Sequence, residues 1–141
     1  GLQLGCSLVV VDITFLRLTT MNDTLILIAL LFTKHLIVDF PLQTKFQWPN
    51  KGTYGHLGGL VHAALHGFGT WACLAWYAPQ AALWLSLFDM VIHYHIDWAK
   101  MNLNAWFGWK PDTHEQFWWL LGVDQYLHAL TYIGLVALVT V

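Results

Sequence analysis

The strongest constraint on the fold is the presence of four long apolar stretches in a chain of only 141 residues. They cover residues 22–40, about 55–77, about 80–106 and about 115–141. A helix rises about 1.5 Å per residue, so each stretch is long enough to cross a bilayer. Only 10% of the residues are charged, whereas an ordinary soluble domain has roughly a quarter. The sequence therefore predicts an all-α fold, an integral membrane antiparallel four-helix bundle.

Local signals suggest where these helices begin and end. Asn22 or Asp23 is a suitable N-cap for the first helix, and Pro41 ends it. Residues 1–20 contain a shorter apolar run that Asp12 and Arg17 interrupt. We expect this stretch to be a short N-terminal extension, either a peripheral helix, a leader or sequence from upstream, ahead of a transmembrane domain at 21–141.

Composition excludes two functional classes. Six Lys and Arg residues and a formal net charge of -2 provide too little positive charge for a nucleic-acid binder. Cys6 and Cys73 are isolated, so a disulfide scaffold is excluded as well. Four of the five lysines lie in or near two loops, Lys45 and Lys51 in one and Lys100 and Lys110 around the other. The positive-inside rule predicts that these lysine-bearing loops are cytoplasmic.

Each apolar stretch contains a pair of His or Asp residues separated by four positions, and the third contains a second such pair, Asp89 with His93. This spacing places both side chains of a pair on one helix face. The pairs lie in the C-terminal halves of the first and third helices and in the N-terminal halves of the second and fourth. In an antiparallel bundle they share one level, and ionisable groups at such depth need a partner or a function. The pattern predicts a shared metal site made by His35, Asp39, His62, His66, His93, Asp97, Asp124 and His128.

Imidazole and carboxylate ligands suit a divalent metal, with Zn favoured over Mn or Fe. Eight groups exceed the four ligands of a tetrahedral zinc, which favours two ions, or one ion with a catalytic base. Asp89 lies one turn deeper than His93, where it is expected to orient that imidazole or to pass protons. His56, His95 and His114 are expected to lie outside the site, as capping or solvated side chains.

Four ordered motifs resemble a known family. They are the run from His35 to Gln43 followed by Asn50-Lys51, the pair His62 and His66, the segment from His93 to Lys100, and Asp124-Gln125 with His128. Together, from about Met21 onward, they resemble the small polytopic inner-membrane proteins of bacteria and phages known as domain of unknown function 3307. The resemblance implies a multi-pass protein of the bacterial inner (plasma) membrane and brings no established activity.

The leading functional expectation is a metal-dependent hydrolase that acts on a lipid-linked or phosphoester substrate near the cytoplasmic face. The metal would activate a water molecule, and whichever of Asp39, Asp97 and Asp124 is not a ligand would serve as general base. Lys100 and Lys51, at the rim, would hold an anionic head group, unless they only extend toward the interface. Gln43 and Gln125 are further hydrogen-bond donors for that group.

Two alternatives belong to other classes. One is a redox subunit in which the histidines bind haem or a di-iron centre. A bis-His haem site needs two imidazoles and no carboxylate, so the three nearby aspartates make haem the less favoured form of this alternative. The other is a metal transporter or an accessory subunit of a larger membrane complex. Transport predicts polar residues that continue toward the opposite surface, and beyond Asp89 they largely stop.

Overall fold

The computed structural model describes residues 2–140, with side chains described for residues 21–140. The chain forms four α-helices and one short 3₁₀ turn: α1 (Leu2–Asp39), η1 (Trp48–Asn50), α2 (Leu57–Leu74), α3 (Pro79–Phe107) and α4 (Glu115–Thr140). Residues 2–140 contain no strand, which confirms the all-α prediction. The three later helices begin and end within a few residues of their predicted positions.

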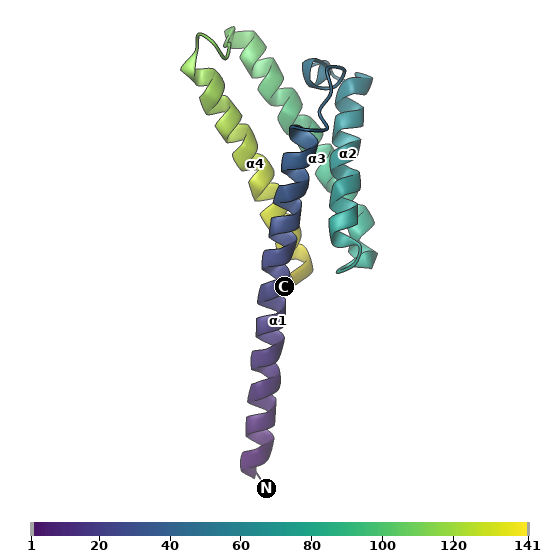
Figure 1. The fold of residues 1–141 in the computed structure, drawn as a ribbon, viewed down its shortest axis with the longest axis vertical. Coiled ribbons are helices and arrows are strands. Elements are labelled where there is room, and N and C mark those ends of the chain that lie inside the picture. The colour runs from purple at the N-terminus through teal and green to yellow at the C-terminus, as the bar shows by residue number, and fades with distance from the viewer. Residues whose placement is uncertain (1, 141) are drawn as a thin grey trace.

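The helices form an antiparallel bundle in the order of the chain. α1 packs against α2 and α4, and α3 packs against the same two helices, so α1 and α3 lie on opposite corners. The C-terminal ends of α1 and α3 and the N-terminal ends of α2 and α4 meet at one end of the bundle, together with the loop that carries η1 (Figure 1). This arrangement brings the four predicted pairs to one level.

Helix ends follow from local sequence at three places. Pro79 opens α3, where its missing N–H costs nothing. Gly108 follows α3 with φ 67°, the left-handed conformation that glycine adopts most readily, and its N–H donates to the carbonyls of Ala105 and Asn104. His56 caps α2, because its Nδ1 accepts a hydrogen bond of 3.0 Å from the Gly58 N–H.

The prediction that α1 starts at Asn22 or Asp23 is wrong. The helix runs through both residues from Leu2, because no Pro or Gly near them interrupts the backbone hydrogen bonds. Residues 2–20 thus continue α1 along the backbone. The side chains of this segment, including Asp12 and Arg17, lie outside the described residues.

The interior has an apolar layer and a polar layer. The apolar layer joins all four helices near the C-terminus of α4, through Leu27, Leu31, Leu74, Ala82, Tyr132, Leu135 and Val136. The polar layer lies closer to the loop that carries η1, and it contains all eight predicted site residues, each of them buried. Small residues allow the helices to approach: Gly67 of α2 faces the Ser86 carbonyl and the Met90 side chain of α3.

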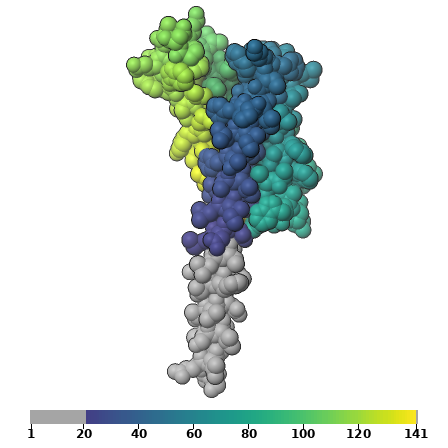
Figure 2. Space-filling model, viewed as in Figure 1, coloured from purple at the N-terminus to yellow at the C-terminus, as the bar shows by residue number. Residues whose placement is uncertain are grey.

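The outer surface of the bundle is rich in large apolar side chains. Leu25, Phe68, Trp84 and Leu138, one from each helix, are all exposed. Figure 2 shows how the four helices from residue 21 onward pack into one continuous body. Two helices, Met21–Asp39 of α1 and Glu115–Thr140 of α4, are long and apolar enough to cross a membrane. Within the described residues, α2 and α3 do not combine the length and the mean hydropathy expected of a membrane-spanning helix.

Candidate metal centre

Asp39, at the end of α1, is the first focus of the polar layer. Its Oδ1 lies 3.0 Å from His62 Nε2 and 3.1 Å from His66 Nε2, both on α2. Its Oδ2 lies 3.1 Å from His35 Nε2, one turn back on α1. Three imidazoles from two helices thus surround one carboxylate, as the spacing of four residues predicts.

Asp97, on α3, is the second focus. Its Oδ2 lies 3.3 Å from both His62 Nε2 and His93 Nε2, and these two ring nitrogens are 3.1 Å apart. Its Oδ1 lies 3.8 Å from His128 Nε2 on α4. The His93 ring stacks on the His128 ring with centroids 4.1 Å apart. Asp124 closes the set, with Oδ1 3.6 Å from His128 Nε2.

This geometry can hold a metal ion. Asp39, His62, His66 and His93 each offer a ligand atom, and these atoms all lie within 4.8 Å of one another; His93, Asp97 and His128 form a second such group. Two atoms that bind one ion at about 2 Å lie roughly 3–4 Å apart. The separations of 3.0 to 3.3 Å around His62 fall in this range. Both groups contain His93, so they would hold one ion or two neighbouring ions.

Several buried polar atoms have no hydrogen-bond partner in the described part of the chain. They include Nδ1 of His62 and His93, Nε2 of His128, and Oδ1 of Asp97 and Asp124. A buried polar atom without a partner costs about 1–3 kcal/mol. Three of these atoms lie together, since His128 Nε2 is 3.8 Å from Asp97 Oδ1 and 3.6 Å from Asp124 Oδ1, and each keeps a lone pair free, as the ligand atoms of a cation site must. In His62 and His93 the unpartnered nitrogen is Nδ1, and Nε2 is the atom that faces the carboxylates.

Two lysines contact the polar layer in ways that the sequence analysis did not predict. Lys51, predicted at the rim, is buried, and its Nζ lies 2.8 Å from Asp97 Oδ2. Lys34, to which no role was given, is buried on α1 next to His35. Its Nζ donates to Asp89 Oδ2 at 3.0 Å.

The predicted role of Asp89 is therefore corrected. Asp89 accepts hydrogen bonds from Lys34 and from the Thr70 hydroxyl, the latter at 2.6 Å, and neither bond reaches His93. The reason is the depth of Asp89, which lies one turn from His93 on α3, where the Lys34 side chain from α1 is within hydrogen-bond distance. A lysine inside an apolar stretch and an aspartate at similar depth were the available signal for this pair.

A cleft of about 220 Å³ opens beside the centre. Asp39, Lys51 and Lys100 line it together with Gln43 and Gln125. Lys100 reaches into it while its Nζ stays 3.5 Å from Asp124 Oδ2. The cleft thus joins a carboxylate of the centre to two cationic and two amide side chains.

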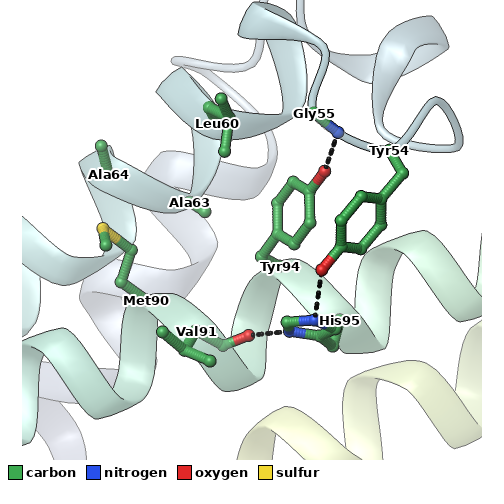
Figure 3. Close-up of a pocket in the computed structure, with 9 residues that line it drawn as sticks. All are labelled: Tyr54, Gly55, Leu60, Ala63, Ala64, Met90, Val91, Tyr94 and His95. Carbon is green, nitrogen blue, oxygen red and sulfur yellow. Dashed lines mark hydrogen bonds between the residues drawn. The ribbon is translucent and has the colours of Figure 1, made fainter.

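The histidines that were expected outside the site lie outside it. His95 is exposed and bonds to the Tyr54 hydroxyl at 3.2 Å and to the Val91 carbonyl at 2.7 Å. Figure 3 shows this ring at the edge of a shallow apolar pocket between α2 and α3, with Tyr94 beside it. His114 precedes α4, where its Nδ1 is 2.8 Å from the Thr113 hydroxyl.

Comparison with known proteins gives a family and no activity. No curated protein and no solved structure matches the chain. The family described as "Protein of unknown function (DUF3307)" matches residues 26–141, which include all four His/Asp pairs and both lysines of the cleft. Because this match covers most of the chain, the protein belongs to the DUF3307 family.

Proposed function

We propose that this chain is a multi-pass membrane protein whose buried centre binds zinc, or Mn or Fe in its place, and hydrolyses a phosphoester or lipid-linked substrate. One observation carries the proposal. Buried imidazole and carboxylate atoms from all four helices approach one another at ligand spacing, directly beside a cleft that contains Lys51 and Lys100. A centre with a cationic cleft at its side is suited to an anionic substrate.

The lipid bilayer is the proposed surroundings of the bundle. Exposed apolar side chains on every helix would meet lipid, and α1 and α4 have the length and hydropathy of spans. We place the protein in the inner membrane of a bacterium with the lysine-bearing loops in the cytoplasm. Lys51 and Lys100 are in ion pairs, so the orientation depends mainly on Lys45 and Lys110, which are exposed.

Different side chains of the site would contribute to different steps of hydrolysis. A metal ion supplies Lewis-acid activation of water and of the phosphoryl group when it is bound. Asp39 lies both in the centre and in the wall of the cleft, so it is the carboxylate best placed to accept a proton from water. Lys100 and Lys51 neutralise the substrate's phosphate, and Gln125 can donate to its oxygens.

The alternatives have less support. The His66 and His93 rings stack with centroids 3.5 Å apart and the His93 and His128 rings with centroids 4.1 Å apart, which favours a metal ion over a haem between them. A permeation path would have to cross the apolar layer, where Leu27, Leu31 and Leu135 are fully or almost fully buried. A di-iron redox centre remains the second candidate, because the two ligand groups share His93 and would place two ions side by side.

Phosphate release tests the proposal. Full-length protein in detergent, loaded with zinc, is incubated with a short-chain lipid phosphate monoester and with a lipid pyrophosphate. We expect release of inorganic phosphate that Asp97→Asn abolishes and that Asp112→Asn, an exposed loop position, leaves unchanged. Equal rates in wild type and Asp97→Asn, or no release from either substrate, would reject the hydrolase.

A further inference from the structure

The five histidines of the polar layer differ in how their ring nitrogens are bonded. Both nitrogens of His66 have partners, and so do both nitrogens of His35. Among the other three, His62 and His93 each have an unpartnered Nδ1, and His128 has an unpartnered Nε2. A difference of this kind within one cluster suggests two roles for the same residue type.

Lys34 is the source of the difference. Its ammonium group has three N–H donors and no acceptor. Those three donors have three partners: Asp89 Oδ2 at 3.0 Å, the Tyr132 hydroxyl at 3.2 Å and His66 Nδ1 at 3.4 Å. Asp89 balances the charge, which leaves the other two bonds to set the direction of hydrogen bonding in the layer.

The bond to His66 determines the tautomer of that ring. Because Lys34 can only donate, Nδ1 of His66 has to accept, and the ring proton is then on Nε2. His66 Nε2 lies 3.1 Å from Asp39 Oδ1, to which it donates. A nitrogen that carries a proton has no lone pair for a metal ion, although His66 Nε2 is close enough to the other ligand atoms to share one.

The same constraint reaches His35 through Tyr132. The buried Tyr132 hydroxyl accepts from Lys34, so its own proton needs an acceptor, and His35 Nδ1 lies 2.8 Å away. The proton of His35 is then on Nε2, which lies 3.0 Å from Gln125 Oε1 and 3.1 Å from Asp39 Oδ2. The Gln125 amide nitrogen donates to two carboxylates, to Asp124 Oδ2 at 3.1 Å and to Asp39 Oδ2 at 3.4 Å, so its oxygen is the atom that accepts from His35.

We infer that Lys34 divides the histidines into two that orient Asp39 and three that bind the metal. His66 and His35 donate to the two oxygens of Asp39 and hold its carboxylate in place. His62 and His93 each present Nε2 to Asp97 at 3.3 Å, and no donor such as Lys34 fixes a proton on that nitrogen. With Asp97 they bind an ion, and His128, whose Nε2 is unpartnered, binds the same ion or a neighbouring one. Lys34 is thus a positioning residue for the centre. The inference rests on the proposed metal centre, and it predicts which histidines are its ligands.

The tautomers can be measured without metal or substrate. Full-length protein labelled with ¹⁵N-histidine is studied by NMR in detergent after chelation, with rings assigned from single His→Gln variants. We expect His66 and His35 to carry their proton on Nε2. Lys34→Met should move the His66 proton toward Nδ1, because the donor to that nitrogen is gone. A His66 ring with its proton on Nδ1 in the wild type would overturn the inference, whether or not the variant folds.

Zinc binding provides the second test. His66→Ala and His35→Ala should retain zinc with an affinity lowered by roughly 10–100-fold, the usual effect of losing an orienting partner. The absorption spectrum of the cobalt-substituted protein should keep its shape in both variants. His62→Ala and His128→Ala should lose the ion on gel filtration. Equal loss of zinc in His66→Ala and His62→Ala would overturn the inference. A wild type that binds no zinc would instead reject the proposed function, and the NMR measurement of the tautomers would then test the role of Lys34 by itself.

Discussion

Lys51 Nζ lies 2.8 Å from Asp97 Oδ2, although Lys51 belongs to the loop between α1 and α2 and Asp97 lies within α3. Both side chains are buried. The loop thereby returns over the polar layer and supplies a positive charge to the carboxylate at its centre. The same ammonium is 3.8 Å from Asp39 Oδ1, so one lysine serves both foci of the layer.

Removing this lysine should destabilise the metal-free protein. Lys51→Met leaves Asp97 buried without its cation, and breaking a buried pair in this way costs about 3–5 kcal/mol. We expect a clear fall in the melting temperature of chelated protein in detergent, and a smaller fall in zinc-loaded protein, because the ion replaces the lost charge. Lys45→Met, an exposed position in the same loop, is the control and should change neither value. Equal melting temperatures for Lys51→Met and wild type after chelation would contradict this.

Gly69 should not tolerate a larger residue. A Cβ at this position would lie 2.5 Å from Lys34 Cγ and 2.9 Å from its Cδ, close to the stem of a side chain whose ammonium is held at three points. Gly69→Ala is therefore expected to cost about 1–3 kcal/mol, measured as a lower melting temperature. Gly134→Ala on α4 meets nothing within 4 Å and should stabilise its helix by up to about 1 kcal/mol. Two variants of equal stability would show that Lys34 is free to move.

Lys100 should act on substrate affinity more than on metal binding. It lines the cleft beside the centre and lies near Asp124 without belonging to either ligand group. Lys100→Met should raise KM for a phosphoester by about tenfold, which corresponds to roughly 1.4 kcal/mol, while the zinc content stays at the wild-type level. Lys110→Met, an exposed lysine beyond α3, is the matched control. Loss of zinc in Lys100→Met with an unchanged KM would place this lysine in the centre instead.

Chelation should loosen the whole bundle, because the inferred ligands come from α2, α3 and α4, and Asp39 of α1 contacts the ligand His62 at 3.0 Å. An ion present at about 100 times its dissociation constant stabilises the folded state by roughly 2.7 kcal/mol. We expect the melting temperature to fall on treatment with a chelator and to return when zinc is added. A melting temperature that the chelator leaves unchanged would show that the helices are held by packing alone.

The meeting of the eight site residues could be predicted because two simple rules cover it. A spacing of four residues places His93 and Asp97 on one face of α3, and antiparallel packing brings the end of one helix level with the start of the next. Both rules can be applied without knowing the conformation of any side chain. His95, only two residues from His93, lies on another face for the same reason, and the structure places it outside the layer.

The roles of Lys34 and Lys51 could not be predicted in this way. The partner of Lys34 is Asp89, 55 residues along the chain, and the contact depends on how far one side chain reaches between helices. The burial of Lys51 depends on the path of a loop without regular structure apart from η1. Periodicity constrains helix faces, whereas loop paths and the direction of hydrogen bonds follow from packing.

Metal content is the most direct measure of the central claim. Full-length wild type, His93→Ala and His95→Ala are purified in detergent, dialysed against trace zinc and analysed for bound metal. We predict one or two zinc ions per chain in the wild type and in His95→Ala, and none in His93→Ala, whose imidazole belongs to both ligand groups. A wild type without stoichiometric Zn, Mn or Fe, or a His93→Ala variant that retains the full amount, would contradict the account.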